Sequence, residues 1–185
     1  IILFETDRLT KLTSNLLDVN NFDKDNIFLD ISRFNLHDSI RKTAGALEGV
    51  AAKKDIHFDL ELSDTEPLWV SGDKDKIQQV LHNLMDNAVK FSHEGSSILI
   101  STREKGNRVF VSVKDSGIGI PKDDLGKIFE RFYKTDLSRG KDKLGTGLGL
   151  SICKEIITAH KQNLDVVSTE GVGSEFVFTL TKETE

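Results

Sequence analysis

The sequence predicts an α+β fold, a sandwich of two layers in which helices cover one face of a sheet. Apolar residues recur at helical spacing after positions 35, 74 and 148, so amphipathic helices are expected there. Apolar and polar residues alternate in paired segments at 97–114 and 164–180, which is typical of two hairpins. Strands and helices do not alternate regularly along the chain. A mixed, mostly antiparallel sheet is therefore expected, not a doubly wound one.

The composition limits the class of protein. The chain has 185 residues, of which 37% are hydrophobic and 30% charged, and this suits one soluble domain with a short addition. The net charge of -5 gives no broad basic field, so no nucleic-acid partner is expected. No apolar run approaches the roughly 18 residues of a membrane span.

Cys153 is the only cysteine, which excludes an intrachain disulfide and fits a reducing compartment. Because Ile152 and Ile156 lie close to it, a buried structural thiol is expected rather than a nucleophile. The chain begins at Ile1 with neither a methionine nor a signal-peptide pattern, so we expect a fragment of a longer protein.

Residues 1–26 are expected to hold one helix that precedes the sandwich. Its apolar residues follow a 7-3-4-3 spacing, which indicates a narrow seam of coiled-coil type: Ile2, Leu9, Leu12, Leu16 and Val19. Such a seam usually faces another helix, and the alternative is packing against its own domain. Residues 27–34 are expected to be an extended linker, and 35–185 the sandwich domain.

The elements of the domain follow in order. Asn35 is a suitable N-cap for a helix with an apolar face from Leu36 to Ala51. Alternation at 56–62 predicts a half-buried strand, and a short apolar piece follows Pro67. The remaining expectations are a helix at 74–91, strands at 97–103 and 108–114, a helix from Pro121 with Leu125, Ile128, Phe129 and Phe132 on its apolar side, a lid-like loop at 134–144, a helix at 148–160, and strands at 164–168 and 175–180.

Polar residues on the 74–91 helix form the first candidate site. Asn83, Asn87 and Lys90 lie within an arc of about 60° beside the apolar face. A carboxamide oxygen is a suitable ligand for Mg²⁺, and an ammonium group suits phosphate oxygens. The alternative is an ordinary solvated flank.

Two glycine-rich turns form the second candidate site, at 115–119 and 145–149. The second turn leads directly into a helix, whose first amides could hold a phosphate group. The alternative is a pair of flexible loops. Neither turn is a Walker motif, because Leu150 follows Gly149 where that motif requires lysine.

Together these segments resemble the motifs of bacterial sensor histidine kinases. The segments 82–91, 115–120, 129–133 and 145–152 resemble the N box, the first glycine box, the F box and the second glycine box, and 171–174 resembles the closing turn. The resemblance covers roughly residues 35–182. It implies a Bergerat-type ATP-binding sandwich as the catalytic domain, and it implies that residues 1–26 are part of the second helix of the dimerisation and histidine-phosphotransfer hairpin.

The resemblance also implies roles for single residues. Asp115 would accept hydrogen bonds from the adenine amino group, Asn87 would hold Mg²⁺, and Asn83, Lys90 and Arg131 would serve catalysis at the phosphates. The implied nucleotide-binding set comprises Asn83, Asn87, Lys90, Phe91, Asp115, Gly117, Gly119, Ile120, Gly145, Thr146, Gly147, Leu148 and Gly149. ATP and Mg²⁺ are thus the expected cofactors.

The implied partners are the phosphotransfer helices of a parent kinase and a response regulator. The parent would be a homodimer anchored in the cell membrane, with this part in the cytoplasm. No box with an acceptor histidine is present, so the fragment is expected to bind ATP without phosphorylating itself. In addition, Lys161 and Gln162 stand where the family usually has glycines.

Two other functions remain open. One is a module that senses a nucleotide without transferring phosphate. The other is an ATPase of the gyrase, chaperone or mismatch-repair branch, in which a glutamate serves as the general base. In those ATPases the glutamate stands four residues before the asparagine that binds the metal. This chain has Asn83 at that position, four residues before Asn87, which favours transfer to histidine over hydrolysis.

Overall fold

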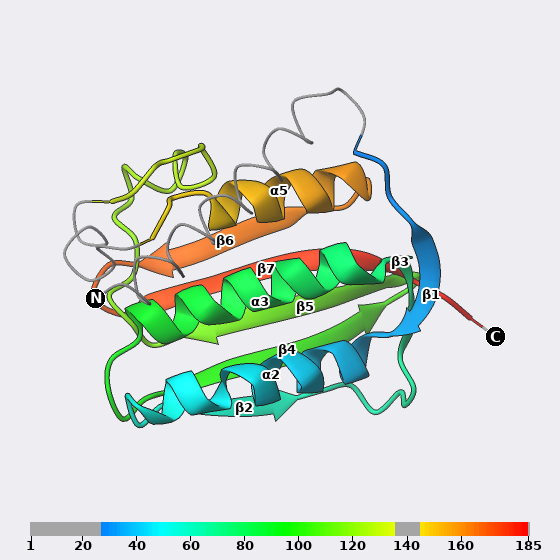
Figure 1. The fold of residues 1–185 in the computed structure, drawn as a ribbon, viewed down its shortest axis with the longest axis horizontal. Helices are drawn as coiled ribbons and strands as arrows, with labels where there is room; N and C mark the ends of the chain where they lie inside the picture. The colour runs from blue at the N-terminus through cyan, green and yellow to red at the C-terminus, as the bar shows by residue number, and fades with distance from the viewer. Residues whose placement is uncertain (1–26, 136–144, 185) are drawn as a thin grey trace, which may run out of the picture.

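A computed structural model describes residues 27–135 and 145–184. The helix expected within residues 1–26 and most of the expected lid lie outside these residues. The described part contains seven strands in one sheet and three helices on one of its faces, which confirms the predicted α+β sandwich (Figure 1). The elements are β1 (Ile31–Asn35), α2 (Leu36–Ala52), β2 (His57–Glu61), β3 (Trp69–Asp73), α3 (Lys74–Phe91), β4 (Ser97–Lys105), β5 (Arg108–Asp115), α5 (Gly149–Ala159), β6 (Leu164–Thr169) and β7 (Gly173–Lys182).

The sheet is mixed and mostly antiparallel, as predicted. Its strand order is β1-β3-β7-β5-β4-β2, with β6 paired to β7. Only β2 and β4 pair in parallel, while the hairpin of β4 and β5 extends antiparallel from Leu99–Lys114 to Lys105–Arg108. In consequence, the end of β5 at Asp115 lies opposite Ser174 at the start of β7.

One apolar core fills the space between the helices and the sheet. The central helix, α3, buries Ile77, Leu81 and Leu84 completely or almost completely. Alternate residues of the strands meet this face, including Ile98, Ile100, Val109, Val111, Val113, Phe178 and Leu180. Each such side chain stabilises the fold by about 2 kcal/mol through its burial. The core therefore fixes α3 against the middle of the sheet.

The predicted N-cap of α2, Asn35, is present, and Asp73 caps α3 in the same way. The side chain of Asn35 accepts a hydrogen bond from the amide of His37, and that of Asp73 accepts one from Lys76. These bonds satisfy amides that have no partner within the helix. The helix predicted at 74–91 has these bounds in the structure.

The helix predicted from Pro121 is wrong. Residues 122–132 form successive turns, with the amide of Asp124 bonded to the carbonyl of Pro121 and the amide of Ile128 bonded to that of Asp124. Phe132 has a φ of 64°, which a continuing helix does not allow, and its side chain is 60% exposed. The apolar spacing is real, since Ile128 is buried, but it serves packing without a helix.

Two strands differ from expectation at the edges of the sheet. The expected linker contains β1, which pairs with β3 from Ile31 onward, so the sandwich begins before residue 35. Only Phe34 of β1 is buried, so the sequence shows no alternation there. The predicted half-buried strand is present as β2, yet Leu60 is 38% exposed because β2 is an edge strand.

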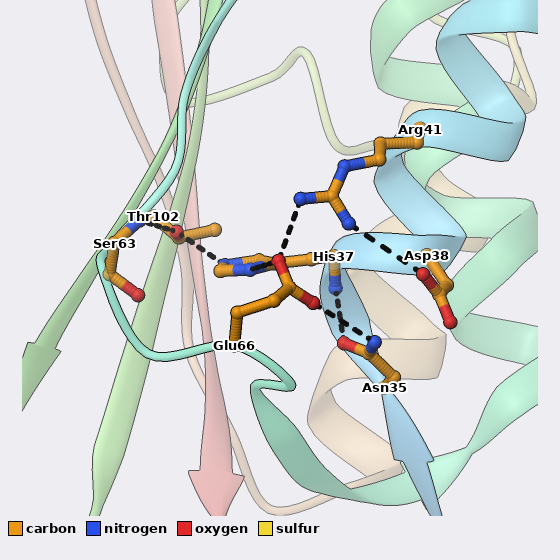
Figure 2. Close-up of polar contacts among 7 residues, drawn as sticks. All are labelled: Asn35, His37, Asp38, Arg41, Ser63, Glu66 and Thr102. Atoms are coloured by element: carbon orange, nitrogen blue, oxygen red, sulfur yellow. Dashed lines mark hydrogen bonds and ion pairs between the residues drawn. The ribbon is translucent and has the colours of Figure 1, made fainter.

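A polar cluster joins the start of α2 to the connection between β2 and β3 (Figure 2). The carboxylate of Glu66 accepts hydrogen bonds from Asn35 (3.3 Å), from Nδ1 of His37 (3.1 Å) and from Arg41 (2.6 Å). The other ring nitrogen of the fully buried His37 lies 3.0 Å from the hydroxyl of Thr102 on β4. Since a carboxylate only accepts, Nδ1 of His37 carries a proton here. The cluster holds α2 to the sheet far from the glycine turns.

Candidate functional site

Asp115 ends β5 and is only 7% exposed. Its Oδ1 atom accepts hydrogen bonds from the amides of Gly117 (2.9 Å) and Ser174 (3.3 Å). Burial raises the pKa of the Asp115 carboxyl, while these two amides and the charge of His93 act in the opposite direction. No described residue engages Oδ2. A buried, fixed carboxylate with one oxygen left over is suited to accept hydrogen bonds from a ligand.

The first glycine turn packs tightly against the protein's own backbone. A Cβ atom on Gly117 would lie 2.2 Å from the carbonyl oxygen of Phe91, and one on Gly119 would lie 2.1 Å from that of Thr169. The amide of Ile118 donates a hydrogen bond to the carbonyl of Phe91, and the amide of Ile120 donates one to the hydroxyl of Ser168 at 2.8 Å. The turn therefore has no room for a side chain at either glycine, and the contact of these glycines with a base stays a prediction.

Three polar residues of α3 were predicted for the site, and one of them contacts the second glycine turn. The side-chain amide of Asn83 donates to the carbonyl of Gly149 at 3.4 Å. Lys90 forms an ion pair with Asp86 at 2.8 Å, one turn earlier. Asn87 is half-buried, and its side chain makes no hydrogen bond within the described part of the chain. Its carboxamide oxygen is thus available to a ligand.

The side chains at this site limit which kind of metal ion it could hold. Residues 27–135 and 145–184 contain no group of three or more His, Cys, Asp or Glu side chains that could hold one. A single carboxamide such as Asn87 suits Mg²⁺, which keeps several waters and takes further ligands from phosphate groups. The residues present fit a magnesium ion that arrives with a nucleotide, not one held by the protein alone.

The second glycine turn contacts the F-box segment. The amide of Phe132 donates to the carbonyl of Gly147 at 3.0 Å. Gly147 has a φ of 71°, and a Cβ atom there would lie 2.8 Å from the carbonyl carbon of Phe132. Only glycine fits this combination of backbone angle and close approach. Residues 131–133 and 145–149, which are separated in the sequence by the expected lid, therefore meet in space.

The start of α5 completes this side of the site. Leu148 is fully buried, its amide donates to the hydroxyl of Thr146 at 3.3 Å, and its carbonyl accepts the first helical bond, from Ile152. Gly145 and Gly149 are half-buried. The first amides of a helix have no partner within that helix, so those of α5 could hold an anion.

Arg131 is tied to α5. Its Nε atom lies 3.0 Å from Oε1 of Glu155, in a partly buried ion pair. The predicted contact of Arg131 with phosphate stays a prediction.

Cys153 is fully buried, and burial raises the pKa of its thiol to about 12. The prediction of a structural thiol is confirmed.

One residue beside the site gave no signal in the sequence. Lys54 follows α2, and its ammonium group reaches the backbone of α3 across 35 or more positions. A lysine beyond the last apolar position of an amphipathic helix is ordinary in any protein. Only the packing of α2 beside α3 brings Lys54 to the N box.

The chain is similar to a known family and to several known proteins. Residues 72–184 match the family model described as "Histidine kinase-, DNA gyrase B-, and HSP90-like ATPase". Sensor histidine kinase WalK of Bacillus subtilis is 39% identical over 180 residues, which cover 95% of this chain and 29% of WalK. Sensor protein SrrB of Staphylococcus aureus is 36% identical over 192 residues, which cover 98% of this chain and 31% of SrrB. The chain thus spans less than a third of these relatives.

Several solved structures are similar to the chain in fold and sequence. The catalytic domain of histidine kinase ThkA has a TM-score of 0.73 at 36% identity, with 83% of this chain and 96% of that domain covered. Full-length ShkA in complex with AMPPNP has a TM-score of 0.84 at 28% identity, with 97% and 37% covered. ThkA in complex with the response regulator TrrA has a TM-score of 0.78 at 32% identity, with 96% and 49% covered.

Proposed function

Because the chain belongs to the histidine kinase-, DNA gyrase B- and HSP90-like ATPase family, we propose that it binds ATP with Mg²⁺ and presents the γ-phosphoryl group to a histidine on a phosphotransfer helix. The observation that carries this proposal is the carboxylate of Asp115. It is buried and oriented by two backbone amides, and no described residue pairs with its second oxygen. An exocyclic amino group would supply the missing donors.

The residues of α3 and α5 would serve the phosphates. Asn87 would hold Mg²⁺, which when bound neutralises charge on the phosphate oxygens. Lys90 would add a positive charge from the last turn of α3, oriented by Asp86. Asn83 would fix the second glycine turn through its bond to Gly149, and Arg131 would contribute charge from the F-box segment. Catalysis would then rest on positioning and electrostatic stabilisation.

Asn83 also bears on the alternative of an ATPase. A carboxamide does not accept a proton as a glutamate does, so it cannot act as the general base for water. Its amide is bonded to Gly149, which supports a positioning role. Transfer to a histidine is the function that these contacts favour. A nucleotide-sensing module would have the same site, so only the labelling experiment described below distinguishes it from a kinase.

The whole protein would act in two-component signalling. We propose a homodimer that assembles through the hairpin of which residues 1–26 are part, and a response regulator as the receiver of the phosphoryl group. ThkA, one of the similar structures, was solved with such a regulator. None of the helices in the described part of the chain has the length and apolarity to cross a bilayer. We propose that this region works in the cytoplasm and that a membrane anchor belongs to the rest of the parent.

Two measurements test the proposal. Calorimetric titration of the chain with ATP, with and without Mg²⁺, should give saturable binding that Mg²⁺ strengthens. Radiolabelled ATP should then label a separately supplied phosphotransfer hairpin that carries the acceptor histidine. Binding followed by labelling is the expected result. Binding without labelling would favour the nucleotide-sensing module, and absence of binding would contradict the proposed site.

A further inference from the structure

The ammonium group of Lys54 contacts three backbone carbonyls at the end of α3. Nζ lies 2.6 Å from the carbonyl oxygen of Val89, 3.0 Å from that of Lys90 and 3.0 Å from that of Ser92. The backbone of Lys54 contacts the same segment, because its carbonyl accepts a hydrogen bond from the amide of Gly95 at 3.0 Å. Lys54 therefore holds residues 89–95 with both its side chain and its main chain.

The ammonium group of Lys54 complements the carbonyl groups at the end of α3 in both charge and hydrogen bonding. The last carbonyls of a helix lack partners within the helix and carry the negative end of its dipole. An ammonium group has three donors and one positive charge, so it satisfies three such carbonyls at once. The cap residue of α3, Ser92, has extended backbone angles, so the chain leaves the helix abruptly at this point. Lys54 stabilises that exit.

The segment that Lys54 holds is in direct contact with the first glycine turn. The carbonyl of Phe91, which lies between the carbonyls bonded to Lys54, accepts the amide of Ile118 at 3.2 Å. Ser92 and Gly117 form an antiparallel bridge. A Cβ atom on Gly117 would lie 2.2 Å from the Phe91 oxygen, so the first glycine turn packs closely against the end of α3. A shift of the three carbonyls would therefore also move the turn.

We propose that Lys54 is a positioning residue for the nucleotide site: it fixes the end of α3 against the first glycine turn, and so sets Asp115 relative to Asn87. This inference rests on the proposed function. An ordinary helix cap would stabilise α3 without altering affinity for a ligand. The two roles differ in what replacement of Lys54 does to the turn and to nucleotide binding.

The first experiment needs no nucleotide. Amide hydrogen exchange of the 185-residue chain is compared with that of Lys54→Met. The Ile118 amide should exchange about tenfold faster in the variant, whereas the Lys182 amide, bonded to Asn107 at the other end of β7, should be unaffected. Lys54→Arg keeps the charge and should restore part of the protection. An Ile118 amide that exchanges at the original rate would overturn the proposal.

The second experiment measures ATP binding by calorimetry. Lys54→Met should weaken binding of ATP with Mg²⁺ about tenfold, because Asn87 and Asp115 would no longer be held at a fixed distance from each other. Lys53→Met removes the same charge from the neighbouring exposed position and should bind like the original chain. Unchanged affinity in Lys54→Met would overturn the proposal.

A further variant separates positioning from general loss of stability. Glu66→Gln loosens the cluster at the opposite end of α2 (Figure 2) and should lower stability without weakening ATP binding. If it weakens binding as much as Lys54→Met, loss of stability explains both results and the positioning role is refuted. If the original chain does not bind ATP, the proposed function fails, while the exchange experiment still decides the role of Lys54.

Discussion

The amide of Ile118 donates a hydrogen bond to the carbonyl oxygen of Phe91, with 3.2 Å between the two atoms. Phe91 is the last residue of α3, and Ile118 lies between the two glycines of the first glycine turn. This bond joins the helix that carries Asn87 to the turn that follows Asp115. Two motifs separated by more than twenty positions in the sequence thus act as one unit in the structure.

Gly117→Ala should destabilise the chain. The added methyl group would overlap the Phe91 carbonyl at 2.2 Å and approach Oδ1 of Asp115 at 2.9 Å, so the turn must move away from α3. Overpacking against backbone costs about 2–3 kcal/mol of unfolding free energy. Urea unfolding followed by circular dichroism measures this loss. Gly126→Ala is the control, because no atom lies within 4 Å of a Cβ there, and it should change stability by less than about 0.5 kcal/mol.

Asn87→Ala should abolish the effect of Mg²⁺ on ATP affinity. The variant loses the one carboxamide oxygen that we propose to bind the ion, so titrations with and without Mg²⁺ should give the same dissociation constant. His82→Ala, at an exposed position on the same helix, controls for the change in helix propensity. An Asn87→Ala variant that still binds ATP more tightly with Mg²⁺ would refute the metal assignment.

The Glu66 cluster should make stability depend on acid pH. Hydrogen bonds from Arg41, His37 and Asn35 lower the pKa of the Glu66 carboxyl to about 2, from a reference value of 4.5. A depressed pKa means that the stabilisation is present above about pH 4.5 and disappears as the pH falls toward 2. The difference in unfolding free energy between the original chain and Glu66→Gln should therefore be largest at neutral pH and shrink across that range.

Salt gives a second test of this cluster. The Glu66 side chain is 45% exposed, so added salt should screen its ion pair with Arg41 and reduce the difference from Glu66→Gln. Glu48→Gln, an exposed change on the same helix, controls for the loss of one surface carboxylate. If the difference in unfolding free energy between the original chain and Glu66→Gln grows as the pH falls, the lowered pKa of Glu66 is contradicted.

Local patterns were sufficient for much of the fold. The caps Asn35 and Asp73 and the periodicity of α3 mark helices whose packing agrees with their sequence. The segment after Pro121 has the same signals, with proline, acidic residues and apolar spacing, but it is not helical. There the amide of Phe132 bonds to Gly147, a partner that no local pattern indicates.

The polar residues of the site and of the Glu66 cluster also differ in how far the sequence reveals them. Asp115, Asn87 and the glycine turns are recognisable because their residue types are unusual at those positions. Lys54, His37 and Glu66 are not, since each is ordinary within its own segment. Lys54 acts on carbonyls at least 35 positions away, and Glu66 lies 29 positions from His37. Such contacts depend on how α2 packs, which the sequence shows only through the complete fold.

The central claim is that Asp115 recognises a nucleotide base, and Asp115→Asn tests it most directly. Asparagine preserves the size of the side chain and can still accept the bonds from Gly117 and Ser174, but it presents a donor where the base requires an acceptor. Calorimetry should show ATP binding weakened by at least about a hundredfold, with an unchanged circular dichroism spectrum. Equal affinity in the folded variant and the original chain would contradict the account.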